Sequence, residues 1–414
     1  MLRTGMLLAL ICLVLGAALC ELKPVMAGDP YSENLNGYKV CTDQLFRDVV
    51  TQAGYPMVSH KVKTQDGYIL RIFRIQGKNS QITGGKKVVI LQHGLFDSAD
   101  NFVINGDHHS LAFVLADKGY DVWISNSRGN KYSRSHVSLN PSSKEFWDYS
   151  FQEMGKYDIQ ANIEFILQQT GKSKLTYIGH SQGTTQMFAA LSSESSDFIN
   201  SKVDKFIALA PVVLLRTVSS VVIAKMAADT ILVKALQVLG ITEILPGGCS
   251  KSSPVKWLTS QFCMMATYFC QLFMGITDDK PWYNSPTIMG TLNYHYPSGT
   301  SLKTLVHFQQ MMAQNDQGNP KFMMFDYGSQ TNQKKYGSET PTEYDLRRIK
   351  IPVRLLIGNQ DKLATPSDNK ILADRLRSYG VNVKEYYYDN CGHSTFVWAK
   401  DSSKIYGDVI SELN

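Results

Sequence analysis

The chain has 414 residues, of which 43% are hydrophobic, 11% aromatic and 19% charged. This composition is typical of a globular protein and excludes a disordered or fibrous one. The formal net charge is +6, from 42 lysines and arginines against 36 aspartates and glutamates. The basic residues are scattered, with their densest cluster at Arg347, Arg348 and Lys350, so nucleic acid is not expected as a partner.

Residues 1–20 have the pattern of a secretory signal. Arg3 supplies the positive charge, residues 6–15 form an apolar run, and Ala18-Leu19-Cys20 is a small-x-small cleavage site. An uncleaved anchor is the alternative, but the run is shorter than the roughly 20 residues that span a bilayer. We therefore expect a mature chain that begins near Glu21, enters the secretory pathway and keeps no stable transmembrane anchor.

The cysteine count predicts a free thiol in the oxidising compartment to which a secretory signal leads. The sequence has 7 cysteines, and loss of Cys12 and Cys20 with the signal leaves an odd number, which implies at least one free thiol. No pair has CxxC spacing, so neither a zinc ribbon nor a thioredoxin-like site is indicated. We expect neither a metal nor a cofactor.

The first element predicted after the signal is a β-hairpin at residues 60–76. Apolar and polar residues roughly alternate on both sides of Asp66-Gly67. Asp-Gly supplies the positive φ angles that a two-residue turn needs.

Four short apolar runs follow, separated by longer segments of helical spacing such as 151–169. Strands that alternate with helices indicate a parallel sheet, and apolar strands without polar alternation are covered on both faces. The four predicted strands are 88–91, 120–125, 175–178 and 205–209.

After Pro211 the pattern changes. Residues 218–245 have helical spacing with apolar residues nearly all round, 262–276 are rich in Met, Phe and Cys, and 285–343 show little periodicity. Strand and helix patterns then resume at 351–358, 367–379, 383–388 and from Lys404. We therefore predict one α/β domain, formed by residues 21–214 and 345–414, which a mainly helical cap insertion at 215–344 interrupts.

The motif that indicates chemistry is Gly179-His180-Ser181-Gln182-Gly183. A G-x-S-x-G nucleophile sits on a strained turn from strand to helix, and the two glycines remove side chains that would clash there. The pattern alone is weak, because about 0.2 chance matches are expected in a chain of this composition. Here it follows an apolar strand and precedes a helical segment, so Ser181 is the candidate nucleophile.

A serine nucleophile needs a base, which in α/β-hydrolases follows both the serine and the acid in the chain. Of 9 histidines only His295, His307 and His393 come after Ser181, and the first two lie in the insertion. His393 follows the last predicted strand, where a loop can direct it to the carboxyl edge of the sheet. We predict His393 as the base, with a structural loop histidine as the alternative.

The predicted acid is Asp361, which follows the penultimate strand. Asp368 lies at the start of a helical stretch, where capping explains it. Asp389 is too close to His393 in the sequence to come from a separate strand. A solvated loop acid is the alternative for Asp361.

Attack on an ester creates an oxyanion, which two backbone N–H groups usually bind. One should belong to Gln182, the residue after the nucleophile, and the other to the loop after strand 88–91. In that loop we predict Leu95, with Phe96 as the neighbouring alternative. His93 is interpreted as a structural histidine that fixes the loop.

With these residues the sequence resembles the acid lipase family, the gastric and lysosomal triacylglycerol and cholesteryl ester hydrolases. The resemblance covers nearly all of the mature chain and is weakest in the cap. It depends on several motifs together, which are Gly54-Tyr-Pro, Asp66-Gly-Tyr-Ile-Leu, Leu91-Gln-His-Gly-Leu95, Asp121-Val-Trp, Asn126-Ser-Arg-Gly-Asn130, Gly179-His-Ser-Gln-Gly-Thr184, and His393 with Phe396-Val-Trp398.

The resemblance implies an α/β-hydrolase fold and a serine ester hydrolase that acts through an acyl-enzyme. It implies a triad of Ser181, Asp361 and His393, with Leu95 and Gln182 supplying the oxyanion amides. The implied partner is a neutral lipid at an oil–water interface, and we rank triacylglycerols before sterol esters. The implied location is extracellular or a lysosomal or phagosomal lumen.

Two further expectations follow from the resemblance. The family's cap usually holds a closely spaced disulfide near a free thiol, which implies one disulfide among Cys249, Cys263 and Cys270. Family membership also implies activity in acid. Because an unperturbed histidine titrates near about 6.5, a base that works in acid needs a site that disfavours its charged form.

Other classes fit the same fold, namely a peptidase or amidase, an acyltransferase, and a non-catalytic lipid-binding relative. A peptidase usually needs polar pockets, whereas this cap is rich in Met, Phe and Leu, and a non-catalytic relative would most simply have lost a triad position. Nothing in the sequence excludes acyl transfer to an alcohol as a side reaction. The apolar stretches 218–239 and 262–276 are candidates for a lid that opens against lipid, with packed cap core as the alternative.

Overall fold

The computed structural model describes residues 32–35, 38–78, 87–220, 230–247, 254–265, 270–271, 274–314 and 319–414. The predicted signal at 1–20 lies outside the described residues. The two candidate lid stretches, 218–239 and 262–276, are described only in part.

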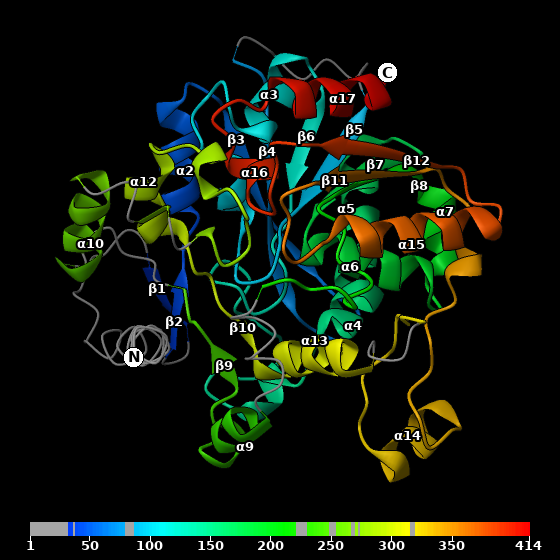
Figure 1. Ribbon diagram of the computed structural model, residues 1–414. Coiled ribbons are helices and arrows are strands. Elements are labelled where there is room, and N and C mark those ends of the chain that lie inside the picture. The colour runs from blue at the N-terminus through cyan, green and yellow to red at the C-terminus, as the bar shows by residue number, and fades with distance from the viewer. Residues whose placement is uncertain are drawn as a thin grey trace, which may run out of the picture.

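A twisted 8-stranded sheet forms the centre of the molecule (Figure 1), with the strand order β12-β11-β8-β7-β5-β6-β4-β3. Neighbours from β12 to β6 are parallel, whereas β4 pairs antiparallel with both β6 and β3. The mostly parallel sheet and all the predicted strands are thus confirmed. The strands are β3 (Met57–Lys63), β4 (Ile69–Ile75), β5 (Val88–Gln92), β6 (Asp121–Ile124), β7 (Leu175–His180), β8 (Val203–Leu209), β11 (Val353–Gly358) and β12 (Val383–Tyr388).

Helices cover both faces of the sheet, which explains why its central strands are mostly apolar. In Figure 1, α3 and α17 lie together on one side and α5, α6 and α15 on the other. Every residue of β5, β6 and β7 is buried. The helices of the α/β domain are α2 (Gln44–Gln52), α3 (Leu111–Asp117), α4 (Phe151–Glu153), α5 (Ile159–Thr170), α6 (Gln182–Leu191), α7 (Ser196–Lys202), α15 (Pro366–Ser378), α16 (Thr395–Trp398) and α17 (Ser403–Leu413).

The predicted hairpin is present, but its two-residue turn is wrong. Thr64 N–H donates to the carbonyl of Tyr68 at 2.8 Å, so residues 65–67 form the loop. Only Gly67 has a positive φ, of +97°, because the longer loop needs a left-handed residue at its last position alone. The Asp66 side chain forms an ion pair with Arg128.

The segment between β8 and β11 is mainly helical, as the cap insertion predicts, although the boundaries at 215 and 344 remain a prediction. Buried apolar side chains such as Met289, Met311 and Phe322 join it to the core of the α/β domain. Its elements are α9 (Thr230–Val238), β9 (Glu243–Ile244), α10 (Pro254–Met265), η4 (Pro281–Tyr283), α12 (Ile288–His295), β10 (Thr300–Ser301), α13 (Leu302–Gln314), α14 (Ser329–Tyr336) and η6 (Leu346–Arg348).

Cys263 and Cys270 form a disulfide, which confirms one bridge among the three cap cysteines. Cys41 is also disulfide-bonded. Cys391 is a free, buried thiol, in agreement with the prediction of at least one free cysteine. Its burial beside the 393 loop excludes it from easy reaction with solvent.

Candidate active site

Ser181 occupies the sharp turn between β7 and α6. Its backbone has φ +54° and ψ −122°, a strained conformation for a residue with a side chain. A Cβ on Gly179 would lie 2.8 Å from Gly183 C and O, and a Cβ on Gly183 would lie 2.4 Å from the Gln92 carbonyl oxygen. Both glycines are therefore needed for α6 to approach β7 and β5 this closely, the steric reason that the motif predicts.

The structure brings Ser181, His393 and Asp361 together at the carboxyl ends of their strands. His393 Nε2 lies 2.7 Å from Ser181 Oγ, and His393 Nδ1 lies 2.8 Å from Asp361 Oδ2. The second carboxylate oxygen, Asp361 Oδ1, accepts the N–H groups of Leu363 and Ala364, each at 2.8 Å. All three side chains are buried. The arrangement can pass a proton from the serine to a histidine that the carboxylate orients.

The alternative acids lie elsewhere. Asp368 Oδ2 accepts the N–H of Thr217 at 2.9 Å, and the exposed Asp389 accepts from the side chain of Asn359 at 2.6 Å. Neither carboxylate bonds to His393, so the described site has one acid partner on the histidine ring.

The two cap histidines are engaged at other contacts. His295 Nδ1 pairs with the buried Asp100 at 2.7 Å, and His307 bonds Ser150 and the carbonyl of Met323, each at 3.0 Å. Burial lowers the pKa of His307 to about 3. Neither histidine contacts Ser181, consistent with their exclusion as the base.

Two opposing effects set the pKa of His393. Burial would lower it, but the charge and hydrogen bond of Asp361, with a further contribution from Asp278, raise it above the usual 6.5. A base that functions in acid needs the opposite direction. The resting site thus offers no support for the expected activity in acid, which stays a prediction.

The loop after β5 lies directly against the serine. A Cβ on Gly94 would be 3.0 Å from Ser181 Cβ and 3.4 Å from its Oγ, so the following N–H, of Leu95, is close to the nucleophile. Among the described residues, neither Leu95 N–H nor Gln182 N–H donates to another protein group. Phe96 has φ +59°, and its carbonyl accepts the N–H of Ser298 from the cap at 2.7 Å. The N–H groups of Leu95 and Gln182 are thus available to an oxyanion.

His93 fixes this loop, as its interpretation from the sequence requires. Its Nε2 accepts the N–H of Ser127 at 3.0 Å, so Nδ1 carries the proton and donates to the carbonyl of Gly94 at 2.8 Å. Burial lowers the pKa of His93 to about 4, so the ring stays neutral and keeps this hydrogen-bonding pattern.

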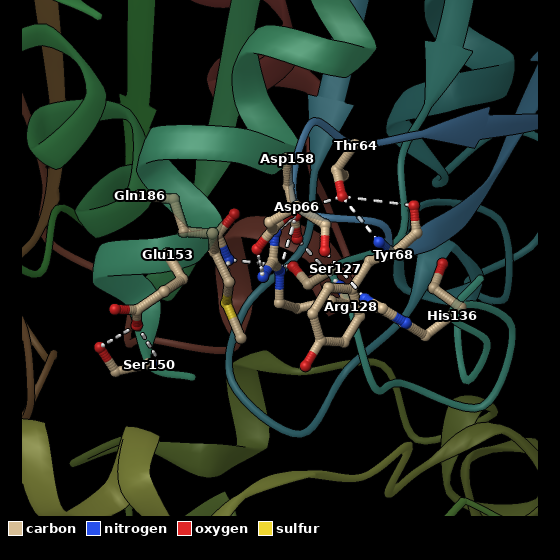
Figure 2. Close-up of polar contacts among 12 residues, drawn as sticks. Thr64, Asp66, Tyr68, Ser127, Arg128, His136, Ser150, Glu153, Asp158 and Gln186 are labelled. Atoms are coloured by element: carbon tan, nitrogen blue, oxygen red, sulfur yellow. Dashed lines mark hydrogen bonds and ion pairs between the residues drawn. The ribbon is translucent and has the colours of Figure 1, made fainter. Parts of the chain in front are cut away.

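A buried arginine, Arg128, holds the loop that supports His93, and Figure 2 shows its contacts with Asp66 and Asp158. Arg128, the neighbour of Ser127, donates Nε to Asp158 at 2.8 Å and Nη1 to Asp66 at 2.6 Å. Its guanidinium also lies 4.1 Å from the centre of the Tyr68 ring. Asp66, predicted only as a turn residue, is therefore part of the support for the loop at Leu95.

Sequence reasoning missed two more residues around His393. His180 donates to the carbonyl of His393 at 2.9 Å, and burial with the nearby His393 charge lowers the pKa of His180 to about 3. Asp278, from the segment between α10 and η4, accepts the N–H of Ser394 at 3.0 Å. His180 was visible inside the G-x-S-x-G motif, whereas no local signal marks Asp278.

Among the described residues, no group of His, Cys, Asp and Glu side chains has the arrangement of a metal site. Within the same ranges, no helix is both long enough and apolar enough to cross a membrane.

Comparison with known proteins gives consistent matches. Residues 46–106 match the family model "Partial alpha/beta-hydrolase lipase region", and residues 87–233 match "alpha/beta hydrolase fold". Gastric triacylglycerol lipase of Rattus norvegicus is 38% identical over 373 residues, 88% of this chain and 90% of that protein. Lysosomal acid lipase/cholesteryl ester hydrolase of the same species is 34% identical over 409 residues, 96% of this chain and 98% of that protein.

Two other comparisons extend these. Lipase lipl-1 of Caenorhabditis elegans is 36% identical over 375 residues, 87% of this chain and 89% of that protein. The solved structure of a "putative lipase" from Sulfolobus solfataricus has a TM-score of 0.53 at 15% identity, covers 87% of this chain and 94% of that one, and shows a shared fold alone. The resemblance noted from the motifs is confirmed, and the chain belongs to the acid lipase family, ester hydrolases with an α/β-hydrolase fold.

Proposed function

We propose that this protein hydrolyses the ester bonds of water-insoluble neutral lipids, triacylglycerols first and sterol esters second, with Ser181 as the nucleophile. The observation that carries the proposal is the hydrogen-bonded series Ser181 Oγ, His393 and Asp361, with distances of 2.7 and 2.8 Å. The printed names of the similar enzymes, a triacylglycerol lipase and a cholesteryl ester hydrolase, support the choice of substrates.

The proposed reaction has two halves. Ser181 Oγ attacks the ester carbonyl while His393 Nε2 takes its proton, and Asp361 stabilises the imidazolium that forms. The N–H groups of Leu95 and Gln182 bind the oxyanion of the tetrahedral intermediate. His393 then gives the proton to the departing alcohol, leaving an acyl group on Ser181. A water molecule, deprotonated by His393, releases the fatty acid in the same way and restores the enzyme.

Exposed apolar side chains of the cap support binding at a lipid surface. Val238 is 87% exposed on α9 and Leu239 follows it at 72%, while Met264 and Met265 on α10 are 53% and 83% exposed. Apolar side chains this exposed in water are favoured at a lipid interface. These four residues belong to the candidate lid stretches 218–239 and 262–276, which the structure describes only in part.

Neutral lipids are ranked above phospholipids because, among the described residues, no Lys or Arg side chain bonds to the side chain of Ser181, His393 or Asp361. The buried Arg128 and Lys131 are each paired with aspartates, and Lys172 and Lys174 precede β7, at the opposite end of the strand from Ser181. A phospholipid headgroup needs a cationic partner. The same reasoning ranks phospholipid well behind triacylglycerol.

We further propose that the protein acts in the secretory pathway or beyond it, outside the cell or in a lysosomal or phagosomal lumen. The signal pattern at 1–20, the Cys263–Cys270 disulfide and the printed names "gastric" and "lysosomal" of similar proteins support this. Fractionation of cells that express the full chain, with blotting of medium and lysosomes, tests it; retention in the cytosol would contradict it.

A substrate panel tests the activity. Purified wild-type protein and Ser181→Ala are compared on triacylglycerols of several chain lengths, cholesteryl esters, phospholipids and a peptide amide, at acid and neutral pH. Products are also analysed with added alcohol, which separates hydrolysis from acyl transfer. We expect triacylglycerol hydrolysis that falls by several powers of ten in Ser181→Ala, because triad members act as a unit. Undiminished activity in that variant would remove the assignment of Ser181.

A further inference from the structure

Asp278 is a fully buried acid beside the candidate base. Its Oδ1 accepts the N–H of Ser394 at 3.0 Å, and its Oδ2 accepts Nδ2–H of Asn284 at 2.7 Å. A Cβ on Gly392 would lie 2.5 Å from Asp278 Cγ. The carboxylate is thus packed tightly against the chain on both sides of His393.

The backbone around Asp278 also holds the acid partner of His393. Asp278 forms an antiparallel bridge with Asp361. Asp279 N–H donates to the carbonyl of Gln360, and Lys362 N–H donates to the carbonyl of Thr277, each at 2.9 Å. One short segment of the cap therefore contacts the loops that carry both Asp361 and His393.

We propose that Asp278 is a positioning residue for His393, which fixes the 393 loop and sets the pH range in which this histidine stays neutral. The proposal rests on the proposed function of His393 as the base. It gives a side chain of the cap an influence on the base, in addition to the lipid-surface contact proposed for the exposed apolar side chains of α9 and α10.

Electrostatics give the sign of the effect. The titratable groups that face His393 are Asp361, Asp278 and His180, and those that face Asp278 are Asp361, His393 and the Cys391 thiol. Burial, together with the charge of Asp361, raises the pKa of Asp278 to about 6. Asp278 therefore takes up a proton as the medium becomes acidic.

The charge of Asp278 affects the pKa of His393. The negative charge of Asp278 favours the imidazolium of His393 and raises its pKa. Protonation of Asp278, or its replacement by a neutral residue, removes this contribution, and His393 then stays neutral to a lower pH. The charge of Asp278 therefore places the acid limb of the base at a higher pH than burial and Asp361 alone would.

Asp278→Asn tests the charge with little change of shape. An asparagine can still accept the N–H of Ser394. Its new NH2 group would meet the amide of Asn284, whose Oδ1 has no hydrogen-bond partner in the described part of the chain. Rotation of the Asn284 amide then turns this oxygen into the acceptor, and all hydrogen bonds are kept. Asp279→Asn is the matched control, because Asp279 is 55% exposed beside Lys362 and carries the same charge.

The assay is the rate at which Ser181 reacts with a soluble p-nitrophenyl phosphonate across pH, with kcat/KM for a short-chain ester in parallel. We expect the acid limb of both profiles to move to lower pH in Asp278→Asn and to stay unchanged in Asp279→Asn. An unmoved limb in Asp278→Asn, or an equal shift in both variants, would overturn the inference.

A second variant covers the case in which Asp278→Asn does not fold. Asn284→Ala removes a hydrogen bond that favours ionised Asp278, so the pKa of Asp278 rises and the acid limb again moves to lower pH. A limb that stays in place or moves upward would overturn the proposal. Failure of the proposed function looks different, since wild-type protein would then react with neither the phosphonate nor the ester.

Discussion

Asp361→Asn gives the sharpest test of the site, because the structure dictates how the asparagine would sit. Asp361 Oδ1 accepts two backbone N–H groups, from Leu363 and Ala364, at 2.8 Å each. An asparagine keeps both bonds only if its carbonyl oxygen faces these amides. The opposite orientation loses two hydrogen bonds of about 1 kcal/mol each and leaves buried donors facing donors.

When the carbonyl oxygen of the asparagine faces Leu363 and Ala364, its NH2 group points at His393 Nδ1. Nδ1 must then be an acceptor, so the ring proton moves to Nε2, which faces Ser181 Oγ at 2.7 Å. In this tautomer Nε2 cannot take the serine proton. We expect kcat to fall by about 10³- to 10⁴-fold, as for a triad histidine held in the wrong tautomer, which corresponds to about 4 to 5.5 kcal/mol in the barrier.

The assay is titration of fatty acid released from a triacylglycerol emulsion, with the pre-steady-state burst from a short-chain ester as a second readout. Asp368→Asn is the control, since Asp368 is also buried and follows the same strand but bonds Thr217 instead of His393. We expect it to retain its kcat. A loss of less than tenfold in Asp361→Asn, or an equal loss in Asp368→Asn, would refute the tautomer argument.

Three further variants probe the surroundings of the site. Gly183→Ala places a Cβ 2.4 Å from the Gln92 carbonyl oxygen and should cost about 3 kcal/mol of stability or more in urea denaturation; Gly407→Ala, where a Cβ meets nothing within 4 Å, should not destabilise. Arg128→Lys cannot pair with both Asp66 and Asp158 and should lower stability by about 3 kcal/mol, together with kcat/KM; a wild-type unfolding midpoint would contradict this. For Asp278, a pKa of about 6 in the folded protein against the usual 3.8 of an aspartate stabilises the protein below about pH 4, and this stabilisation is lost as pH rises through 6. Asp278→Asn should therefore gain about 3 kcal/mol relative to wild type between pH 4 and 7, and a constant difference in denaturation midpoints would refute it.

Much of the α/β domain was predictable because its signals are local. An apolar run such as β7 needs only a few residues to indicate a buried strand, and Gly179 and Gly183 mark the turn that the serine requires. The acid and the base were found by elimination, since parallel strands bring their carboxyl ends to one edge of the sheet. The predicted two-residue turn was wrong because Asp66-Gly67 fits more than one loop length. The contact of Asp66 with Arg128 joins residues 62 positions apart, so a local pattern cannot predict it.

The sequence by itself determined the fold class, the family, and the residues that the structure brings together as Ser181, Asp361 and His393. Only the tertiary structure decided what surrounds them. Asp278 and Ser394 are 116 residues apart, and Asp278 lies between 262–276 and 285–343, in a part of the insertion where no element is predicted, so no pattern could link it to His393. The pKa of His393 likewise results from burial and from carboxylates brought close by folding. Desolvation and Coulomb interactions depend on distance in space, which a linear sequence does not contain.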